Sequence, residues 1–385
     1  MKMKLQMPSL PFLYVFTFFS NMFVGMLGLG LPLFAIQLGA GNIALGALGT
    51  MASLVYIGLV PVSGWLADRV PKNLQAGAGA ILYGVALCLL PLFTRLFWIY
   101  PLVAVAFLAL ALVWPGLESA LCKFVSGKAL AKSSGWYNVS WSSGATIGYL
   151  VAGLIYGRKP AGVFWVAGGL SILFGIFFAL LFRAPSQEPA AQNEAEKGPV
   201  YLLYLSWLAN GMVYFALNVL RNIFPKLAES LGFSSQSLGA LLLCLSLAQC
   251  LLFIILNRTA VWHFKFWPLP AALLVAFAGL VIVVFTEKLW GFALGFLLIG
   301  AAGGVTYSAS LYYAVSLESS IAGSRSGWHE FYLGLGGFAG PLIGGLLAHL
   351  LGPKSPYAVS AGLVVLVLAI QLIYHRWKSR KPAAG

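Results

Sequence analysis

Long apolar runs fill most of this chain, and short polar breaks separate them. Twelve runs reach roughly the 20 residues that an α-helix needs to cross the apolar core of a bilayer. The alternation of apolar and polar residues typical of β-strands does not appear, so the pattern predicts an all-α integral membrane protein with twelve transmembrane helices. The expected helices span residues 10–36, 43–67, 75–94, 97–122, 134–157, 161–183, 200–225, 236–257, 267–286, 288–316, 326–350 and 355–375.

The second half of the chain repeats features of the first half. Residues 31–48 return 193 positions later as residues 224–241, and the glycine-bearing stretch 134–153 returns 192 positions later as residues 326–345. Each half holds six expected helices, and an even number returns the chain to its starting side of the membrane. The two repeats are therefore expected to be parallel, related by an axis along the membrane normal, as in transporters built from structural repeats.

A polar segment with three prolines lies between the two halves. It covers residues 184–199 and is the longest break in the apolar pattern. Its composition is typical of a flexible linker. We therefore predict an N-terminal six-helix bundle over residues 1–183, a cytoplasmic linker over 184–199, and a C-terminal six-helix bundle over 200–385.

The composition supports the membrane assignment, and the basic residues orient the chain. The sequence is 61% hydrophobic and 8% charged, with a formal net charge of +14. With the N-terminus inside, most of the 23 Lys and Arg residues fall in cytoplasmic segments, which follows the positive-inside rule. We therefore expect a monomeric, multi-pass protein of the plasma membrane (a bacterial inner membrane), with both termini cytoplasmic and no nucleic-acid partner.

Sequence signatures of enzymes do not appear. The chain has no GxxxxGK[ST], HExxH or GxSxG segment, and its four cysteines form no CxxC pair. We expect neither an enzyme nor an ATP-driven pump, and no metal or other cofactor. Any energy used would come from an ion gradient or from the gradient of the substrate itself.

A motif lies at the end of the second expected helix, where residues 64–73 read Gly-Trp-Leu-Ala-Asp-Arg-Val-Pro-Lys-Asn. It resembles the G-x-L-a-D-r-x-G-r-k signature of the major facilitator superfamily, although Pro71 replaces the second glycine and Asn73 a basic residue. The resemblance implies a secondary transporter whose halves rock around a central site. It also implies a conformational latch in the outward-facing state, made by Gly64, Asp68, Arg69 and Lys72. The equivalent segment of the second half, residues 257–262, has no acid at the position of Asp68.

A second motif lies in the eleventh expected helix, over residues 336–345. It is similar to the antiporter motif G-x-x-x-G-P-x-x-G-G of the same family, which normally lies in helix five. Small residues at this spacing also let helices approach closely in lipid whatever the direction of transport. We therefore expect helix packing from Gly336, Gly340, Pro341, Gly344 and Gly345, and the inference of antiport stays open.

Two acids fall inside expected helices, Glu118 and Glu330. A charge at membrane depth is costly and faces a cavity or a partner. Both are candidates for proton coupling or gating, and an ion pair near a helix end is the alternative. His329 is the neighbour of Glu330, but adjacent helical residues point to different faces.

Polar and aromatic residues on helix faces mark a candidate substrate cavity. The seventh helix carries four polar residues on one face, and the fifth carries a similar, weaker stripe of Asn138, Ser142, Thr146 and Tyr149. Deep aromatic residues can line a pocket for an apolar or aromatic substrate or fill the bundle. The candidate cavity residues are Asn21, Trp114, Asn138, Trp141, Asn210, Tyr214, Asn218, Arg221 and Tyr307.

The expected function is transport of a small amphipathic or hydrophobic organic solute by alternating access, as a proton antiporter working in efflux. Proton-linked or facilitated uptake of a small nutrient and lipid flipping are the alternatives within transport. A scaffold or receptor on a transporter fold is the alternative outside it, although such a protein has no use for costly polar groups in lipid. The expected partners are the substrate, the lipid bilayer and, for antiport, protons.

Overall fold

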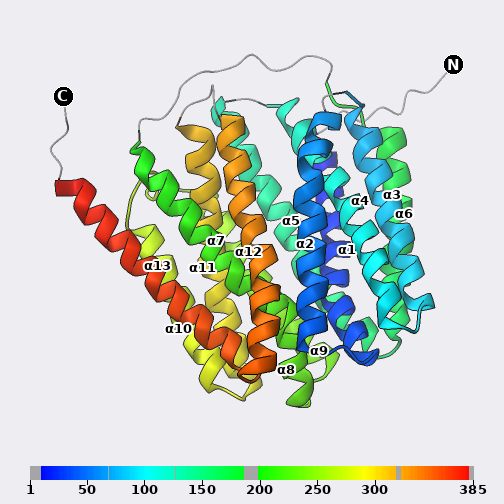
Figure 1. Ribbon diagram of the computed structural model, residues 1–385. Helices are drawn as coiled ribbons and strands as arrows, with labels where there is room; N and C mark the ends of the chain where they lie inside the picture. The colour runs from blue at the N-terminus through cyan, green and yellow to red at the C-terminus, as the bar shows by residue number, and fades with distance from the viewer. Residues whose placement is uncertain (1–9, 68, 126, 186–197, 318–321, 381–385) are drawn as a thin grey trace.

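The computed structural model describes residues 10–67, 69–125, 127–185, 198–317 and 322–380 (Figure 1). These residues form twelve long α-helices, a short helix α8 and one 3-10 turn. Eleven helices are long and apolar enough to cross a membrane. The twelfth, α5, carries a mixed stretch of serine, threonine and asparagine in its middle. The all-α membrane fold predicted from the sequence is therefore confirmed.

The helices follow one another as α1 (Leu10–Gln37), α2 (Asn42–Ala67), α3 (Lys72–Leu89), the turn Leu90–Leu92, α4 (Leu96–Cys122), α5 (Gly127–Tyr156), α6 (Pro160–Leu181), α7 (Val200–Asn222), α8 (Phe224–Ser230), α9 (Ser235–Asn257), α10 (Pro268–Phe285), α11 (Leu289–Ser316), α12 (Ala322–Leu350) and α13 (Ser355–Arg380).

The seventh expected helix is shorter than predicted. It ends at Asn222, and a separate short helix, α8, begins at Phe224 with Pro225 in its first turn. Proline has no N–H to donate and its ring clashes with the preceding turn, so Pro225 favours the break without requiring it. Pro32, its counterpart in the first repeat, lies inside the continuous helix α1. The two repeats therefore differ in backbone at a position where their sequences agree.

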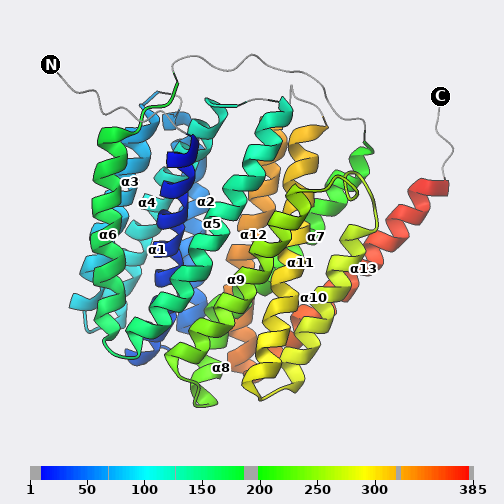
Figure 2. The ribbon, with the colours of Figure 1, turned by 180° about the vertical axis from the view of Figure 1, so that it is seen from behind.

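Helices α1–α6 and α7–α13 form two groups that lie side by side (Figures 1 and 2). Within the first group, α1 packs on α5 and α3 on α6; within the second, α7 packs on α12 and α10 on α13. These pairs correspond under the sequence repeat. Between the groups, α5 packs on α9 and α2 on α12, and these pairs correspond as well. Of the expected linker, residues 186–197 lie outside the described residues.

The glycines of α12 lie on two faces of that helix. A Cβ added at Gly336 or Gly340 would come within 2.8 Å of the backbone of α7, and one at Gly344 within 3.4 Å of Val219 and Ile223 side chains. On the other face, a Cβ at Gly345 would lie 2.6 Å from the carbonyl oxygen of Asn42 in α2. In the same contact, the Pro341 carbonyl oxygen would lie 2.5 Å from a Cβ on Gly46. The motif therefore brings α12 close both to α7, in the same group of helices, and to α2, in the other group.

The two groups approach closely at the end of the bundle away from the start of α1, which we call the distal end. A Cβ on Gly345 would lie 3.0 Å from the Cα of Gly46, and one on Gly239 would lie 3.1 Å from the Cα of Gly153. The offsets of 193 between Gly46 and Gly239, and 192 between Gly153 and Gly345, make these two crossings equivalent. Backbone-to-backbone contact therefore closes the distal end.

At the opposite end, where α1 begins (the terminal end), the two equivalent crossings differ. A Cβ on Gly135 of α5 would overlap the Asn257 side chain of α9, so α5 and α9 stay in contact. A Cβ on Gly58, Gly64 or Gly327 would meet no atom within 4 Å. Figure 1 shows α2 and α12 together at the lower end of the view and apart at the upper end. The crossing of α2 and α12 is therefore not closed at the terminal end, in contrast to that of α5 and α9.

Candidate functional site

An aromatic cluster lies where the two helix groups meet, centred on Tyr307 of α11. The Tyr307 ring centroid lies 5.8 Å from that of Trp141 in α5, 5.9 Å from that of Tyr214 in α7, and 5.4 Å from that of Phe253 in α9. Trp141 and Phe253 also contact each other edge to face at 5.6 Å. We call Trp141, Tyr214, Phe253 and Tyr307 the aromatic cluster. It joins side chains from both halves of the sequence repeat.

Hydrogen bonds hold two of these rings in place. Gln249 of α9, which is fully buried, donates from Nε2 to the Tyr214 hydroxyl at 2.9 Å. The indole N–H of Trp141 donates to Oδ1 of Asn138 at 3.2 Å, one turn earlier in α5. Asn21 of α1 donates to the backbone carbonyl of Trp141 at 2.6 Å. Asn21 and Asn138 therefore position the tryptophan.

Glu118 of α4 and Glu330 of α12 come from different halves and lie within electrostatic reach of each other. Each also interacts electrostatically with the same three hydroxyl groups, those of Tyr56, Tyr137 and Tyr307. The three tyrosines belong to α2, α5 and α11, so helices surround the two acids on several sides. Glu118 is nevertheless exposed, and the Glu330 side chain is 39% exposed. The two acids therefore line a space between the halves that water can enter.

His329 links this acid pair to α11. Its Nδ1 lies 2.6 Å from the Ser310 hydroxyl, its ring meets that of Tyr307 edge to face at 4.9 Å, and the side chain is fully buried. Its Nε2 lies 3.9 Å from Oε1 of Glu330. Adjacent helical residues point apart, as expected, but the long glutamate side chain returns toward the ring. The imidazole thus stands between a buried hydroxyl and the accessible carboxylate.

The four polar residues of α7 have different surroundings. Tyr214 belongs to the aromatic cluster, and Asn218 donates to the Tyr214 carbonyl at 2.8 Å on the side of α12. Asn210 is fully buried, and its amide has no hydrogen-bond partner among the described residues. Arg221 is half-buried and lies within electrostatic reach of Tyr214. Trp114, on α4, is half-buried against two clusters of apolar side chains.

The loop motif after α2 lies at the open, terminal end. Arg69 stacks over the Trp65 ring at 3.9 Å and donates to the Trp65 carbonyl at 3.2 Å, and Lys72 begins α3. A Cβ on Gly64 would meet no atom within 4 Å, so this glycine makes no close helix contact in the present conformation. Asp68 lies outside the described residues.

Five residues of this region were not among the candidates from the sequence: Tyr56, Tyr137, Gln249, Phe253 and His329. Gln249 is the one amide in the middle of the apolar run of α9, and this isolated polar residue was the one sign in the sequence that it could belong to the site. The two tyrosines lie among many aromatic residues in apolar helices, and only the packing distinguishes those within electrostatic reach of the acids.

Comparison with protein families agrees with the geometry. The model of the Major Facilitator Superfamily matches residues 13–206 and again residues 206–384. The two matches cover almost the whole chain and correspond to its two repeats.

Curated relatives are resistance proteins of similar length. The chain is 22% identical over 385 residues to the quinolone resistance protein NorA of Staphylococcus aureus, covering 95% of this chain and 98% of that protein. It is 21% identical over 355 residues to multidrug resistance protein 1 of Bacillus subtilis, covering 85% of this chain and 88% of that one.

Solved structures share the fold at low identity. A bacterial homologue of the human lysosomal transporter Spinster, in an inward-facing and occupied conformation, superposes with a TM-score of 0.76 at 14% identity, covering 97% of this chain and 98% of that one. The human organic anion transporter MFSD10 superposes with a TM-score of 0.69 at 14% identity, covering 94% and 98%. With the repeat, the helix pairs and the family matches in agreement, this chain belongs to the major facilitator superfamily and is a transmembrane secondary transporter.

Proposed function

We propose that this protein exports an amphipathic organic cation in exchange for protons, and that the aromatic cluster with Glu118 and Glu330 forms its binding site. The observation that carries the proposal is the pair of carboxylates, one from each half, within electrostatic reach of each other and of the same tyrosines. The names of the relatives, which describe quinolone and multidrug resistance, support efflux of organic compounds.

The acid pair supplies a physical basis for exchange. Two carboxylates that share one space repel each other, and either protons or a bound cation relieves that repulsion. Because the same charges cannot be neutralised twice, bound protons and a bound cation exclude each other. Mutual exclusion at one site that opens to each side in turn produces exchange.

The aromatic cluster supplies the rest of the binding energy. Aromatic ring faces attract organic cations and cover apolar surface without fixed hydrogen-bond geometry. A site of this composition accepts solutes of different shape that share positive charge and apolar surface. An anionic solute would meet the same two carboxylates and be repelled.

The test is proton-driven accumulation of ethidium, a fluorescent organic cation, in proteoliposomes with an imposed pH gradient. Glu118→Gln and Glu330→Gln each remove a charge while keeping the shape of the side chain. We expect each variant to accumulate ethidium no faster than protein-free liposomes, because a neutral amide cannot alternate between proton and cation.

Glu229→Gln is the matched control, since Glu229 pairs with Lys226 on the distal surface. This variant should accumulate ethidium like the unmodified protein. Proton-driven accumulation in both the Glu118 and the Glu330 variants would place the coupling elsewhere and overturn the proposal.

A further inference from the structure

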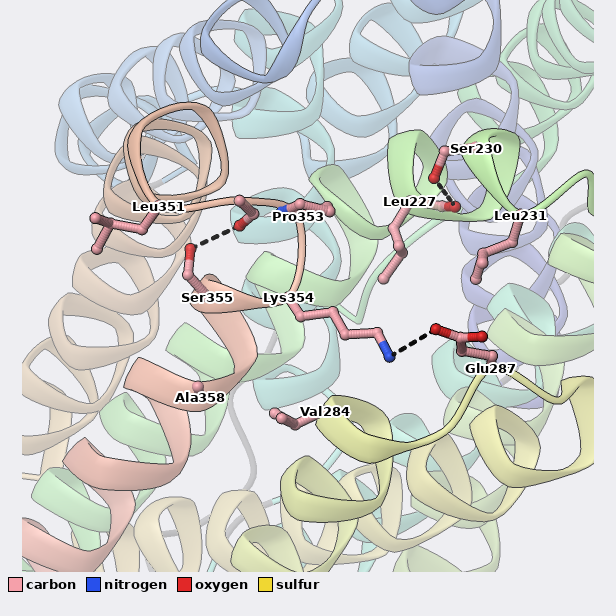
Figure 3. A pocket seen from close by; sticks show the side chains of 11 residues that line it. Leu227, Ser230, Leu231, Val284, Glu287, Leu351, Pro353, Lys354, Ser355 and Ala358 are labelled. Atoms are coloured by element: carbon pink, nitrogen blue, oxygen red, sulfur yellow. Dashed lines mark hydrogen bonds and ion pairs between the residues drawn. The ribbon is translucent and has the colours of Figure 1, made fainter.

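A pocket lies at the distal end, remote from the aromatic cluster and the acid pair. It has a volume of about 480 Å³, within the range of roughly 300–1,000 Å³ typical of small-molecule sites. Figure 3 shows its walls: α8, the connection from α10 to α11, and the connection from α12 to α13. All three belong to the C-terminal half.

One pair of opposite charges stands in this apolar pocket. Lys354 Nζ lies 3.6 Å from Oε1 of Glu287 and donates to the Thr286 carbonyl at 3.1 Å. A direct ammonium–carboxylate hydrogen bond is shorter, about 2.7–2.9 Å. The Glu287 side chain is 73% exposed, so its carboxylate keeps most of its capacity to accept hydrogen bonds. The pair can therefore open to admit a ligand that carries both charges.

The surroundings place this pair at the edge of the bilayer. The membrane-spanning helices α10, α12 and α13 all begin or end around it. Phe285, Trp290 and Leu351 beside it are 81%, 68% and 69% exposed, which is costly in water and favourable against acyl chains. An exposed tryptophan is typical of the interface with lipid headgroups. A ligand arriving from the membrane would thus present its polar part to the ion pair and its apolar part to these side chains.

The same region of the first repeat differs in charge. Phe93-Thr94-Arg95 lies 192 positions before Phe285-Thr286-Glu287, so a basic residue replaces the acid. The connection from α5 to α6, which corresponds to that of Lys354, carries Arg158 and Lys159. Only the second repeat therefore combines a cation and an anion here.

We propose that this pocket binds the headgroup of a phospholipid that carries both a phosphate and a primary amine. The phosphate lies at the Lys354 ammonium, the amine donates to the Glu287 carboxylate, and an acyl chain covers Leu351. Both charges of such a headgroup are matched, whereas an anionic headgroup without an amine meets the carboxylate uncompensated. The inference does not depend on the proposed transport activity, because binding is measured without transport.

The test uses native mass spectrometry of the delipidated full-length protein. It is incubated with equal amounts of phosphatidylethanolamine, phosphatidylcholine and phosphatidylglycerol that share the same acyl chains. We expect the ethanolamine lipid to be retained preferentially, and the choline lipid less, since its methylated amine cannot donate to Glu287. Glycerophosphoethanolamine should compete with the lipid, whereas inorganic phosphate at the same concentration should not.

Two variants assign the contacts. Lys354→Gln should weaken retention of the ethanolamine lipid about tenfold, the loss of one charge-assisted hydrogen bond, and Lys354→Arg should restore it. Glu287→Gln should abolish the preference for the ethanolamine lipid over the glycerol lipid. Unchanged melting temperatures without lipid would show that the variants are folded.

Lys159→Gln in the first repeat is the matched control and should leave retention unchanged. Equal retention of ethanolamine and glycerol lipids by the unmodified protein would overturn the proposal. So would unchanged retention in the Lys354→Gln variant, or displacement of the lipid by inorganic phosphate.

Discussion

Tyr307 is the side chain that contacts most of the candidate site. Its ring meets those of Trp141, Tyr214 and Phe253 in the aromatic cluster and the imidazole of His329, and its hydroxyl interacts electrostatically with both acids. The ring and the hydroxyl therefore have separable roles. The ring supports the aromatic surface, and the hydroxyl lies within electrostatic reach of the two acids.

Substitution of Tyr307 separates these roles. Tyr307→Ala removes the central ring, and we expect the KM for ethidium to rise about tenfold, as loss of a partly desolvated cation–π contact implies. Tyr307→Phe keeps the ring and should leave KM within about twofold of the unmodified value while slowing proton coupling. Initial rates in proteoliposomes give both quantities. Phe97→Ala, at an exposed position in the first turn of α4, is the control, and equal KM values for the Ala and Phe variants of Tyr307 would contradict this assignment.

At this scale the sequence singles out rare residues more readily than common ones. Glu118 and Glu330 stood out because a charge in an apolar helix is exceptional. Tyr56 and Tyr137 did not stand out, because the chain has 16 tyrosines and nothing in the local sequence shows which side of its helix each one occupies. The packing of the helices decides which side chains point into the space between the halves. A single sequence shows the periodicity of each helix but not which helices lie next to it.

At the scale of helices, α12 has the most demanding environment, because it packs closely against both α7 and α2. Its existence and approximate bounds followed from the apolar run, and its glycines were expected to serve packing. The assignment of Gly336 and Gly340 to one neighbour and of Gly345 to the other required the structure. The end of α7 was missed because the same proline is tolerated inside α1.

Gly345 should not tolerate a larger side chain. Gly345→Leu would force its Cβ to 2.6 Å from the Asn42 carbonyl oxygen, and overpacking of this kind costs about 1–3 kcal/mol. We expect the variant to insert in the membrane, to melt at a lower temperature, and to lose ethidium transport because the distal end cannot close. Gly362→Leu in α13, where a Cβ meets no atom within 4 Å, should behave as the unmodified protein. Full transport by the Gly345→Leu variant would show that the crossing is not needed.

At the scale of the whole molecule, α2 and α12 follow a regular antiparallel register. Thr50 donates to the Phe338 carbonyl at 3.2 Å, and a Cβ on Gly334 would meet the Ile57 side chain at 2.6 Å. Extending this register by two turns sets Gly64 opposite Gly327. Their counterparts in the other crossing, Asn257 and Gly135, are already in contact. The closed crossing therefore serves as a template for how the open one closes.

This register predicts a cross-link. Gly64→Cys combined with Gly327→Cys, in a background without the four native cysteines, should form a disulfide under oxidising conditions during turnover, when the terminal end closes. The bond requires Cα atoms about 4.4–6.8 Å apart. Ethidium transport should stop on oxidation and return on reduction. Gly58→Cys with Gly327→Cys is the control that should not cross-link, and failure of the Gly64 pair during turnover would refute the closing motion.

The repeat relates the backbones of the two halves more closely than it relates their ionisable groups. Glu118 corresponds at an offset of 192 to Ser310, and Glu330 corresponds at the same offset to Asn138. The glycine crossings, by contrast, are kept in both copies. The crossings that hold the two halves together are thus symmetric, whereas the charges between them are not. A symmetric frame fixes how the halves move against each other, and the asymmetric acids allow each half to contact a bound solute differently.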